Sequence, residues 1–277
     1  MKYLVCEKVN DRIYAIRDLG LLRSYLVLGD SRAALIDTGV GIGDLKGLVS
    51  SITELPVIVI CTHYHLDHVG GAIKFDQVYL HEKDIPLVSK TDDRQARIDY
   101  AKHIQDSVLN NQDVEIDMDE VVETKTDGYL PMKGGDIFDL GGIHLEIIEC
   151  PGHTPGSSCV LIVEERCIVF GDACAAMTWI FTGNGTVAEY KEALLKLKQR
   201  EDDYDTVLFP HNNMTEPKSV LDDCIEVCDE IIAGTDEKIP YSTPVTNGTY
   251  LLAKAGDFFG REDGKKGNIV YNPNKIC

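Results

Sequence analysis

The segment that decides the fold of this chain runs from residue 62 to residue 71 and reads Thr62-His63-Tyr64-His65-Leu66-Asp67-His68-Val69-Gly70-Gly71. Four metal-capable side chains, three imidazoles and one carboxylate, fall within six residues of this segment. Imidazole suits zinc and other divalent first-row metals, and a carboxylate adds charge and a hard oxygen ligand. An ordinary polar surface loop does not require this alternate spacing followed by two glycines. The segment therefore predicts a metal-binding loop.

The residues before the loop indicate how it is held. Residues 56–60 (PVIVI) form a continuous apolar run, which is typical of a strand that is buried on both faces. Because the chain is extended at a strand end, His63 and His65 are expected to point the same way. A turn after them would aim Asp67 and His68 at a second point nearby. One short loop can then address two metal ions a few ångströms apart, close enough to share a bridging hydroxide.

The segment resembles the HxHxDH signature of the metallo-β-lactamase superfamily, whose members include glyoxalase II, lactonases and tRNA 3′-processing nucleases. Four further segments resemble the family pattern and occur in the family's order: residues 35–39 (LIDTG), 151–157 (PGHTPGS), 170–173 (FGDA) and 210–212 (PHN). The resemblance covers about residues 12 to 233. Five segments in the right order make it specific.

The resemblance implies a role for each matching residue. The first metal would be held by His63, His65 and His153, the second by Asp67, His68 and His211, and Asp172 would bridge the two. Asp67 would also be the catalytic residue that receives or relays a proton. Asp37 would support the site from behind, through a hydrogen bond to one of the histidine rings.

The fold class that the resemblance implies is α/β, an αββα sandwich of two packed sheets with helices outside. Strands in two blocks, each followed by helices, are compatible with this architecture. We interpret residues 1–239 as the metallo-β-lactamase-fold domain, with a helical insert at about 84–129. Residues 240–277, rich in Gly, Asn, Tyr and Thr, are interpreted as a C-terminal extension of hairpins and loops.

The function implied by the resemblance is that of a dinuclear-metal-dependent hydrolase. A metal-bridging hydroxide would cleave a small ester, lactone, thioester or amide. The cofactors would be two divalent metal ions, with Zn²⁺ the default and Fe or Mn also compatible. The alternative is a mononuclear-iron thiol or persulfide dioxygenase of the same fold, with iron on His63, His153 and Asp172. A non-catalytic binding module would lack ligands, whereas all seven positions are filled.

The amino-acid composition limits the kinds of molecule that the chain is expected to bind. The net charge is −19, from 46 acidic and 27 basic residues, and such a surface repels nucleic acids and anionic membranes. A small-molecule substrate is expected instead, and a homodimer is left open. No run of eighteen apolar residues and no signal-peptide pattern occurs, and nine cysteines without a CxxC pair suggest reduced thiols. A cytoplasmic location is therefore expected.

Three segments are candidates for shaping the substrate pocket, and the sequence does not choose between them. An apolar stretch after Asp172, comprising Cys174, Met177, Trp179, Ile180 and Phe181, is either core packing or a hydrophobic wall for an acyl or aryl group. The helical insert is a second candidate, as a lid. The aromatic residues near the C-terminus (Tyr250, Phe258, Phe259 and Tyr271) could cap the site or form a dimer contact.

Overall fold

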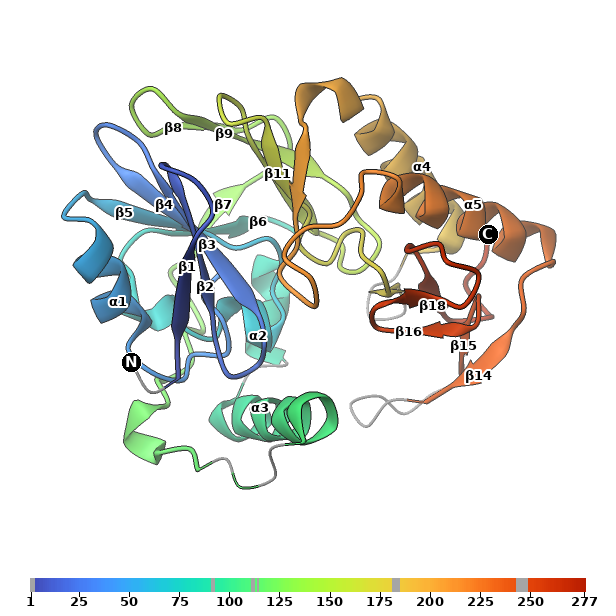
Figure 1. The fold of residues 1–277 in the computed structure, drawn as a ribbon, viewed down its shortest axis with the longest axis horizontal. Coiled ribbons are helices and arrows are strands. Elements are labelled where there is room, and N and C mark those ends of the chain that lie inside the picture. The colour runs from blue at the N-terminus through green and yellow to red at the C-terminus, as the bar shows by residue number, and fades with distance from the viewer. Residues whose placement is uncertain (1–2, 91–92, 111–112, 114, 181–184, 243–248) are drawn as a thin grey trace. The chain divides into compact units, whose positions relative to one another are not determined.

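The computed structural model describes residues 3–90, 93–110, 113, 115–180, 185–242 and 249–277 (Figure 1). The chain forms two compact units, Met1–Leu145 and Glu146–Cys277, each with its own apolar core. The domain boundary predicted between residues 239 and 240 stays a prediction, and this position lies inside strand β14 (Ile239–Tyr241).

The first unit is built on one seven-stranded sheet, whose strands follow the chain order from β1 to β7. The first four strands pair antiparallel, and β4 to β7 pair parallel. The apolar run predicted as a buried strand is β5, which lies between β4 and β6. The strands are β1 (Val5–Lys8), β2 (Ile13–Arg17), β3 (Arg23–Leu28), β4 (Ala33–Ile36), β5 (Val57–Ile60), β6 (Val78–His81) and β7 (Leu130–Met132).

The register of β4 and β5 sets the position of the metal-binding loop. Ile36 pairs with Ile60, so the carboxyl ends of two parallel strands meet at one edge of the sheet. Asp37 therefore comes beside the start of the loop, and its backbone N–H donates to the Ile60 carbonyl at 3.0 Å. Asp37 has a φ of +62°, a left-handed conformation that turns the chain sharply and that Asp tolerates better than most residues.

Helices of the first unit cover the sheet and the loops at its edge. Helix α1 (Leu45–Ile52) packs Leu45 and Val49 into the core formed by the sheet. The predicted insert contains the 3₁₀ turns η2 (Ile85–Lys90) and η3 (Met118–Glu120) and helix α3 (Arg94–Leu109). The remaining elements are α2 (Leu66–Val69), η1 (Ala72–Lys74) and β8 (Ile137–Asp139).

In the second unit, too, two neighbouring parallel strands end at one edge of a sheet. Its strands are β9 (His144–Glu149, which starts just before the unit boundary), β10 (Ser158–Ile162), β11 (Cys167–Val169) and β13 (Thr206–Leu208), in the order β13-β11-β10-β9. Strands β11 and β13 are parallel, and Val169 pairs with Leu208. Asp172 and His211 each follow their strand by the same three residues. The two side chains therefore reach the same edge of the sheet.

Two helices, α4 (Val187–Lys198) and α5 (Val220–Ala233), lie side by side and pack on this core (Figure 1). The spacing of Leu194, Leu195 and Leu197 predicts an amphipathic helix from Tyr190 to Arg200, whereas helix α4 begins three residues earlier, at Val187. The reason is a capping box: Thr186 accepts from the Glu189 N–H, and the Glu189 side chain accepts from the Thr186 N–H. The short turn η4 (Glu201–Asp203) leads to β13.

The C-terminal segment, which the sequence predicts to form hairpins and loops, contains short strands, and three of them belong to one sheet. Strands β14, β15 (Tyr250–Leu252) and β18 (Ile269–Tyr271) join β12 (Thr178–Trp179) in a four-stranded sheet of order β12-β18-β15-β14. A two-stranded hairpin, β16 (Gly256–Asp257) and β17 (Gly260–Arg261), lies between β15 and β18 in the chain. Among the helices that the structure describes, none has the length and apolar character needed to cross a bilayer.

Candidate metal centre

Four of the predicted ligands lie together in the first unit, on the loop after β5. The rings of His63 and His65 lie next to each other, with His63 Nε2 3.1 Å from His65 Nδ1. His68 lies beside His63, with ring centroids 4.0 Å apart. Asp67 and His68 both belong to the short helix α2, and Asp67 Oδ2 is 3.8 Å from His68 Nε2. The chain thus turns at Leu66, as the spacing predicts.

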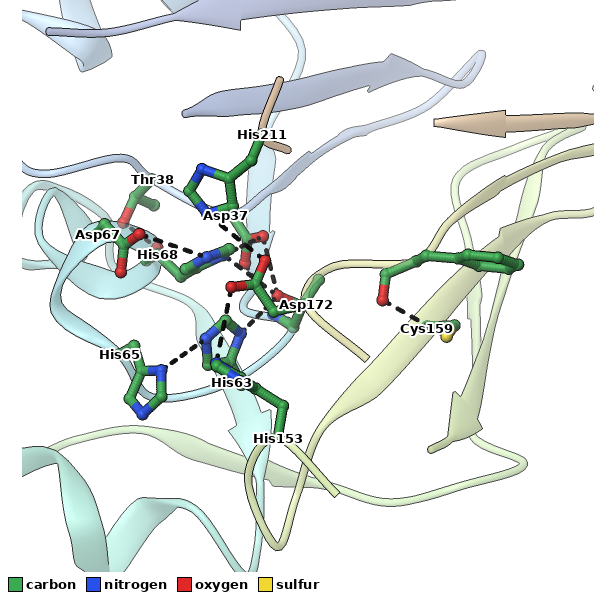
Figure 2. A network of polar contacts seen from close by, with 12 residues as sticks. Asp37, Thr38, His63, His65, Asp67, His68, His153, Cys159, Asp172 and His211 are labelled. Carbon is green, nitrogen blue, oxygen red and sulfur yellow. Dashed lines mark hydrogen bonds and ion pairs between the residues drawn. The ribbon is translucent and has the colours of Figure 1, made fainter. Parts of the chain in front are cut away.

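Asp37 holds the His68 ring from behind, as expected. Its Oδ2 lies 2.8 Å from His68 Nδ1, and both side chains are buried (Figure 2). Because an ionised carboxylate only accepts hydrogen bonds, Nδ1 is the protonated nitrogen of His68. The other nitrogen, Nε2, keeps its lone pair for a metal.

Two threonines, Thr62 and Thr38, also hold Asp37 and the His68 backbone in place. Thr62 donates its backbone N–H to Asp37 Oδ1 at 2.7 Å and its hydroxyl to Oδ2 at 2.9 Å. Thr38 donates its hydroxyl to the His68 carbonyl at 2.9 Å and accepts from the Gly71 N–H at 3.2 Å. Threonine hydroxyls are too common for their sequence positions alone to have indicated these roles.

The Gly-Gly pair after the ligands has a steric reason. A Cβ at Gly70 would lie 2.5 Å from the Val40 carbonyl carbon, and a Cβ at Gly71 would lie 2.6 Å from the Thr38 carbonyl oxygen. Both contacts are with backbone atoms, which cannot rotate away. The loop after Asp37 and the end of the metal-binding loop therefore pack together only if both positions lack a side chain.

Helix α3 of the insert contacts the ligand loop directly, which the sequence did not indicate. Tyr100 donates its hydroxyl to Asp67 Oδ2 at 3.0 Å. One turn away, the fully buried Arg97 donates to the Gly70 carbonyl at 2.9 Å and to the Val40 carbonyl at 3.1 Å. Tyr100 therefore orients the Asp67 carboxylate, while Arg97 ties the helix to the backbone on either side of the loop.

The other three predicted ligands lie together in the second unit. Asp172 Oδ2 is 3.6 Å from His153 Nε2, and Asp172 Oδ1 is 3.5 Å from His211 Nε2 (Figure 2). The two oxygens of one carboxylate thus face two different imidazoles. The bridging role predicted for Asp172 is compatible with this arrangement and stays a prediction.

A backbone carbonyl orients His153, and the residue after His211 is fixed by a second one. His153 Nδ1 lies 2.6 Å from the Trp179 carbonyl oxygen, to which it donates, so Nε2 is the ligating nitrogen. His211 is followed by Asn212, which has a φ of +55° and donates its side-chain amide to the Phe258 carbonyl at 2.5 Å. Neither carbonyl could be named from the sequence, because β12 and the β16–β17 hairpin reach these residues only through tertiary folding.

The donor set of each unit fits a divalent transition metal. Ligand atoms bound at about 2.0–2.1 Å in a tetrahedron lie about 3.3 Å apart. The four donor pairs described above are separated by 3.1, 3.8, 3.6 and 3.5 Å. Imidazole and carboxylate are the ligand types that zinc, iron and manganese accept.

The nearby cysteine is not a ligand candidate. Cys174, two residues after Asp172, is fully buried with its Sγ 3.7 Å from that of Cys224. The hydrogen bond with Cys224, together with burial, raises the pKa of the Cys174 thiol well above its ordinary value. Cys174 and Ile180 belong to the core of the second unit. Of the two roles considered for the stretch after Asp172, these two residues therefore have core packing. Phe181 lies outside the described residues.

A model of the metallo-beta-lactamase superfamily matches residues 19–211 of the chain. The chain belongs to the metallo-β-lactamase superfamily. The match includes all seven predicted ligands and Asp37, which confirms the family that the HxHxDH segment and the four later segments indicated.

Relatives within the superfamily have several names. The chain is 26% identical to acyl-coenzyme A thioesterase MBLAC2 of Homo sapiens, over 53% of this chain and 56% of that protein. It is 29% identical to hydroxyacylglutathione hydrolase GloC of Haemophilus influenzae, over 52% of this chain and 61% of that protein. The alignments thus span little more than half the length of these relatives.

A solved structure, a metallo-beta-lactamase from Pontibacter korlensis, superposes with a TM-score of 0.55 at 18% identity. It covers 80% of this chain and 97% of that one. At this identity the likeness concerns the fold alone, and it confirms the predicted α/β metallo-β-lactamase fold.

Proposed function

We propose that this protein is a dinuclear-metal-dependent hydrolase that cleaves a small ester, lactone, thioester or amide. The observation that carries the proposal is the carboxylate of Asp172, whose two oxygens face His153 and His211 separately. Each oxygen can then reach a different metal ion, as a centre with two ions a few ångströms apart requires. Superfamily membership and the hydrolase names of two relatives support the same reaction class.

In this proposal the ligands of the two units serve one centre. His63, His65 and His153 would hold the first ion, Asp67, His68 and His211 the second, and Asp172 would give one oxygen to each. The support is that each set is already oriented within its own unit, by Asp37, Tyr100 and the Trp179 carbonyl. Such outer hydrogen bonds fix the tautomer and the direction of a ligand.

When bound, a pair of divalent ions supplies a hydroxide nucleophile at neutral pH and polarises the substrate carbonyl. The residues of the chain determine where this chemistry occurs. Asp172 would hold both ions through its two oxygens and would add negative charge to the site. Oδ2 of Asp67 accepts the hydrogen bond from Tyr100 at 3.0 Å, so Asp67 would accept or relay a proton at its other oxygen, Oδ1. Asp37 keeps Nε2 of His68 available throughout.

Thioesters are the first substrate class to test, since the human relative is named an acyl-coenzyme A thioesterase. We further propose Zn²⁺ as the resident ion, a small-molecule substrate and a reducing compartment such as the cytoplasm. All nine cysteines are free thiols, and seven of them are buried, which supports a reducing environment.

Metal content per chain, followed by hydrolysis of a thioester, ester, lactone and β-lactam panel, tests the proposal. We expect two ions per chain and hydrolysis of at least one class. Asp172→Ala should lose metal and hydrolysis together, whereas Asp139→Ala, at an exposed aspartate, should lose neither. Full metal content and an unchanged rate in Asp172→Ala would overturn the proposal. One iron per chain with oxygen consumption would favour the thiol or persulfide dioxygenase instead.

A further inference from the structure

The four-stranded sheet of the second unit has one face that is unusually apolar. Its register places Trp179, Val270, Leu252 and Ile239 in one row across the strands. Because side chains alternate along a strand, Tyr250 and Tyr241 project from the same face. We call the side chains of Trp179, Ile239, Tyr241 and Tyr250, together with Phe258 of the adjacent hairpin, the aromatic face.

The opposite face of this sheet is the one that packs on the core. Ile269 and Tyr271 alternate with Val270, and both are buried against the side chains of α4 and α5. The core of the second unit is therefore complete without the aromatic face. Tyr271 is one of the four aromatic residues predicted either to cap the site or to form a dimer contact, and its buried position excludes it as a cap.

The aromatic face is half exposed. Trp179, Ile239, Tyr241 and Tyr250 are all of intermediate exposure and pack on the buried Leu252 and Val270. The indole of Trp179 has the ring of Tyr241 6.1 Å away and that of Phe258 6.4 Å away, and Phe258 is 46% exposed. In most antiparallel sheets the side facing water carries polar residues, so an apolar row there indicates a ligand or a partner.

Two hydrogen bonds join the aromatic face to the metal-binding residues of the same unit. The Trp179 carbonyl accepts from His153 Nδ1 at 2.6 Å, and the Phe258 carbonyl accepts from Asn212, the residue after His211, at 2.5 Å. The backbone of this face is thus in direct contact with one ligand and with the neighbour of another. A molecule whose carbonyl lies at Asp172 can extend its apolar part over Trp179 and Phe258.

We propose that the aromatic face is the binding subsite for the apolar acyl or aryl group of the substrate. The inference rests on the proposed function, since it places the acyl carbon at the metal centre. The preferred substrates are then acyl compounds with a chain of several methylenes or an aromatic ring, rather than acetyl or formyl derivatives. Contact with aromatic rings rewards each added methylene until the face is covered.

The chain contains a single tryptophan, Trp179, so its fluorescence reports on this face alone. The test titrates the full-length, zinc-loaded protein with linear carboxylates from acetate to decanoate, which share one head group. We expect saturable changes in Trp179 emission, with affinity rising by up to about fourfold per added methylene over the middle of the series. An emission that does not change with any of the longer carboxylates would overturn the proposal.

Phe258→Ala is the variant that probes the face, and Ile232→Ala on helix α5 is the matched control. Both side chains are large, apolar and partly exposed, so both variants should fold. Phe258→Ala should weaken the binding of octanoate and decanoate about tenfold and leave the affinity for acetate unchanged. Ile232→Ala should leave the affinity for all three carboxylates unchanged. Equal affinities for decanoate in Phe258→Ala and wild type would contradict the assignment, and Phe258→Leu should restore part of the loss.

The failures of the two proposals are distinguishable. If no thioester or ester is hydrolysed but decanoate still binds at Trp179, the proposed hydrolase activity is wrong and the apolar subsite stands. If esters are hydrolysed at a rate independent of acyl length and Trp179 does not respond, the hydrolase stands and the subsite is wrong.

Discussion

Replacing Tyr100 with Phe removes one oxygen atom, the one that donates to Asp67 Oδ2 at 3.0 Å. The ring remains, so the packing of helix α3 is kept. Asp67 is a proposed ligand of the second metal, while His63 and His65 belong to the first. The change should therefore act on one metal equivalent and leave the other unaffected.

The magnitude follows from the kind of hydrogen bond. A hydrogen bond to a charged group contributes about 1.5–3 kcal/mol. The Asp67 side chain is 12% exposed, so water can replace part of the lost contact and the lower value applies. About 1.5 kcal/mol corresponds to roughly a tenfold weaker affinity for the second ion. Outer hydrogen bonds to metal ligands typically have effects of this size.

The assay is a competition titration of the metal-free protein with zinc and a chromophoric chelator, which resolves two binding steps. Tyr100→Phe should weaken the second step only. Tyr79→Phe, on strand β6 where the ring packs against Phe138, is the control and should bind both ions as the wild type does. Wild-type affinity at both steps, or an equal loss at both, would refute the reasoning.

Three further changes have defined outcomes. Asp37→Asn should weaken metal binding by about tenfold to a hundredfold, because a neutral amide replaces the carboxylate at His68 Nδ1; unchanged affinity would mean that Asp37 has no supporting role. The Arg200 guanidinium donates two hydrogen bonds to the Glu146 carboxylate and lowers the pKa of Glu146. This pair therefore stabilises the fold at pH values above the unfolded-state pKa of Glu146, which is about 4.3. The stabilisation is lost as the pH falls through the lower pKa that Glu146 has in the folded protein. Arg200→Met should thus lower the free energy of unfolding by about 1 kcal/mol at pH 7 and by less at pH 3 in urea titrations, and an equal loss at both pH values would contradict this. A thiol reagent should modify only the two exposed cysteines, Cys6 and Cys277, quickly in the folded protein, and rapid reaction of more than two would show that the buried thiols are accessible.

The sequence was sufficient for whatever depends on local spacing. Three imidazoles and a carboxylate between His63 and His68 can serve little else than a metal, and the four later segments occur in the order that the superfamily uses. The apolar run at β5 is likewise readable, and residues 219–233 have the spacing that predicts a helix, which the structure has as α5. Burial imposes such patterns on consecutive residues. The start of α4 was misplaced because a cap, rather than the apolar period, sets where a helix begins.

The tertiary structure decided which distant residues support the His63–His68 loop. Tyr100 and Arg97 reach it only because helix α3 packs on residues 40–42 and 70, and nothing in the spacing of the insert encodes that contact. The pairing of Val169 with Leu208 brings Asp172 and His211 to one edge.

Strand register also determined which aromatic residues of the four-stranded sheet are accessible: Tyr271 is buried, whereas Trp179 is partly exposed. The physical reason is the same in each case. Local spacing is a property of consecutive residues, whereas register, packing and side-chain exposure depend on segments that meet only in the folded chain.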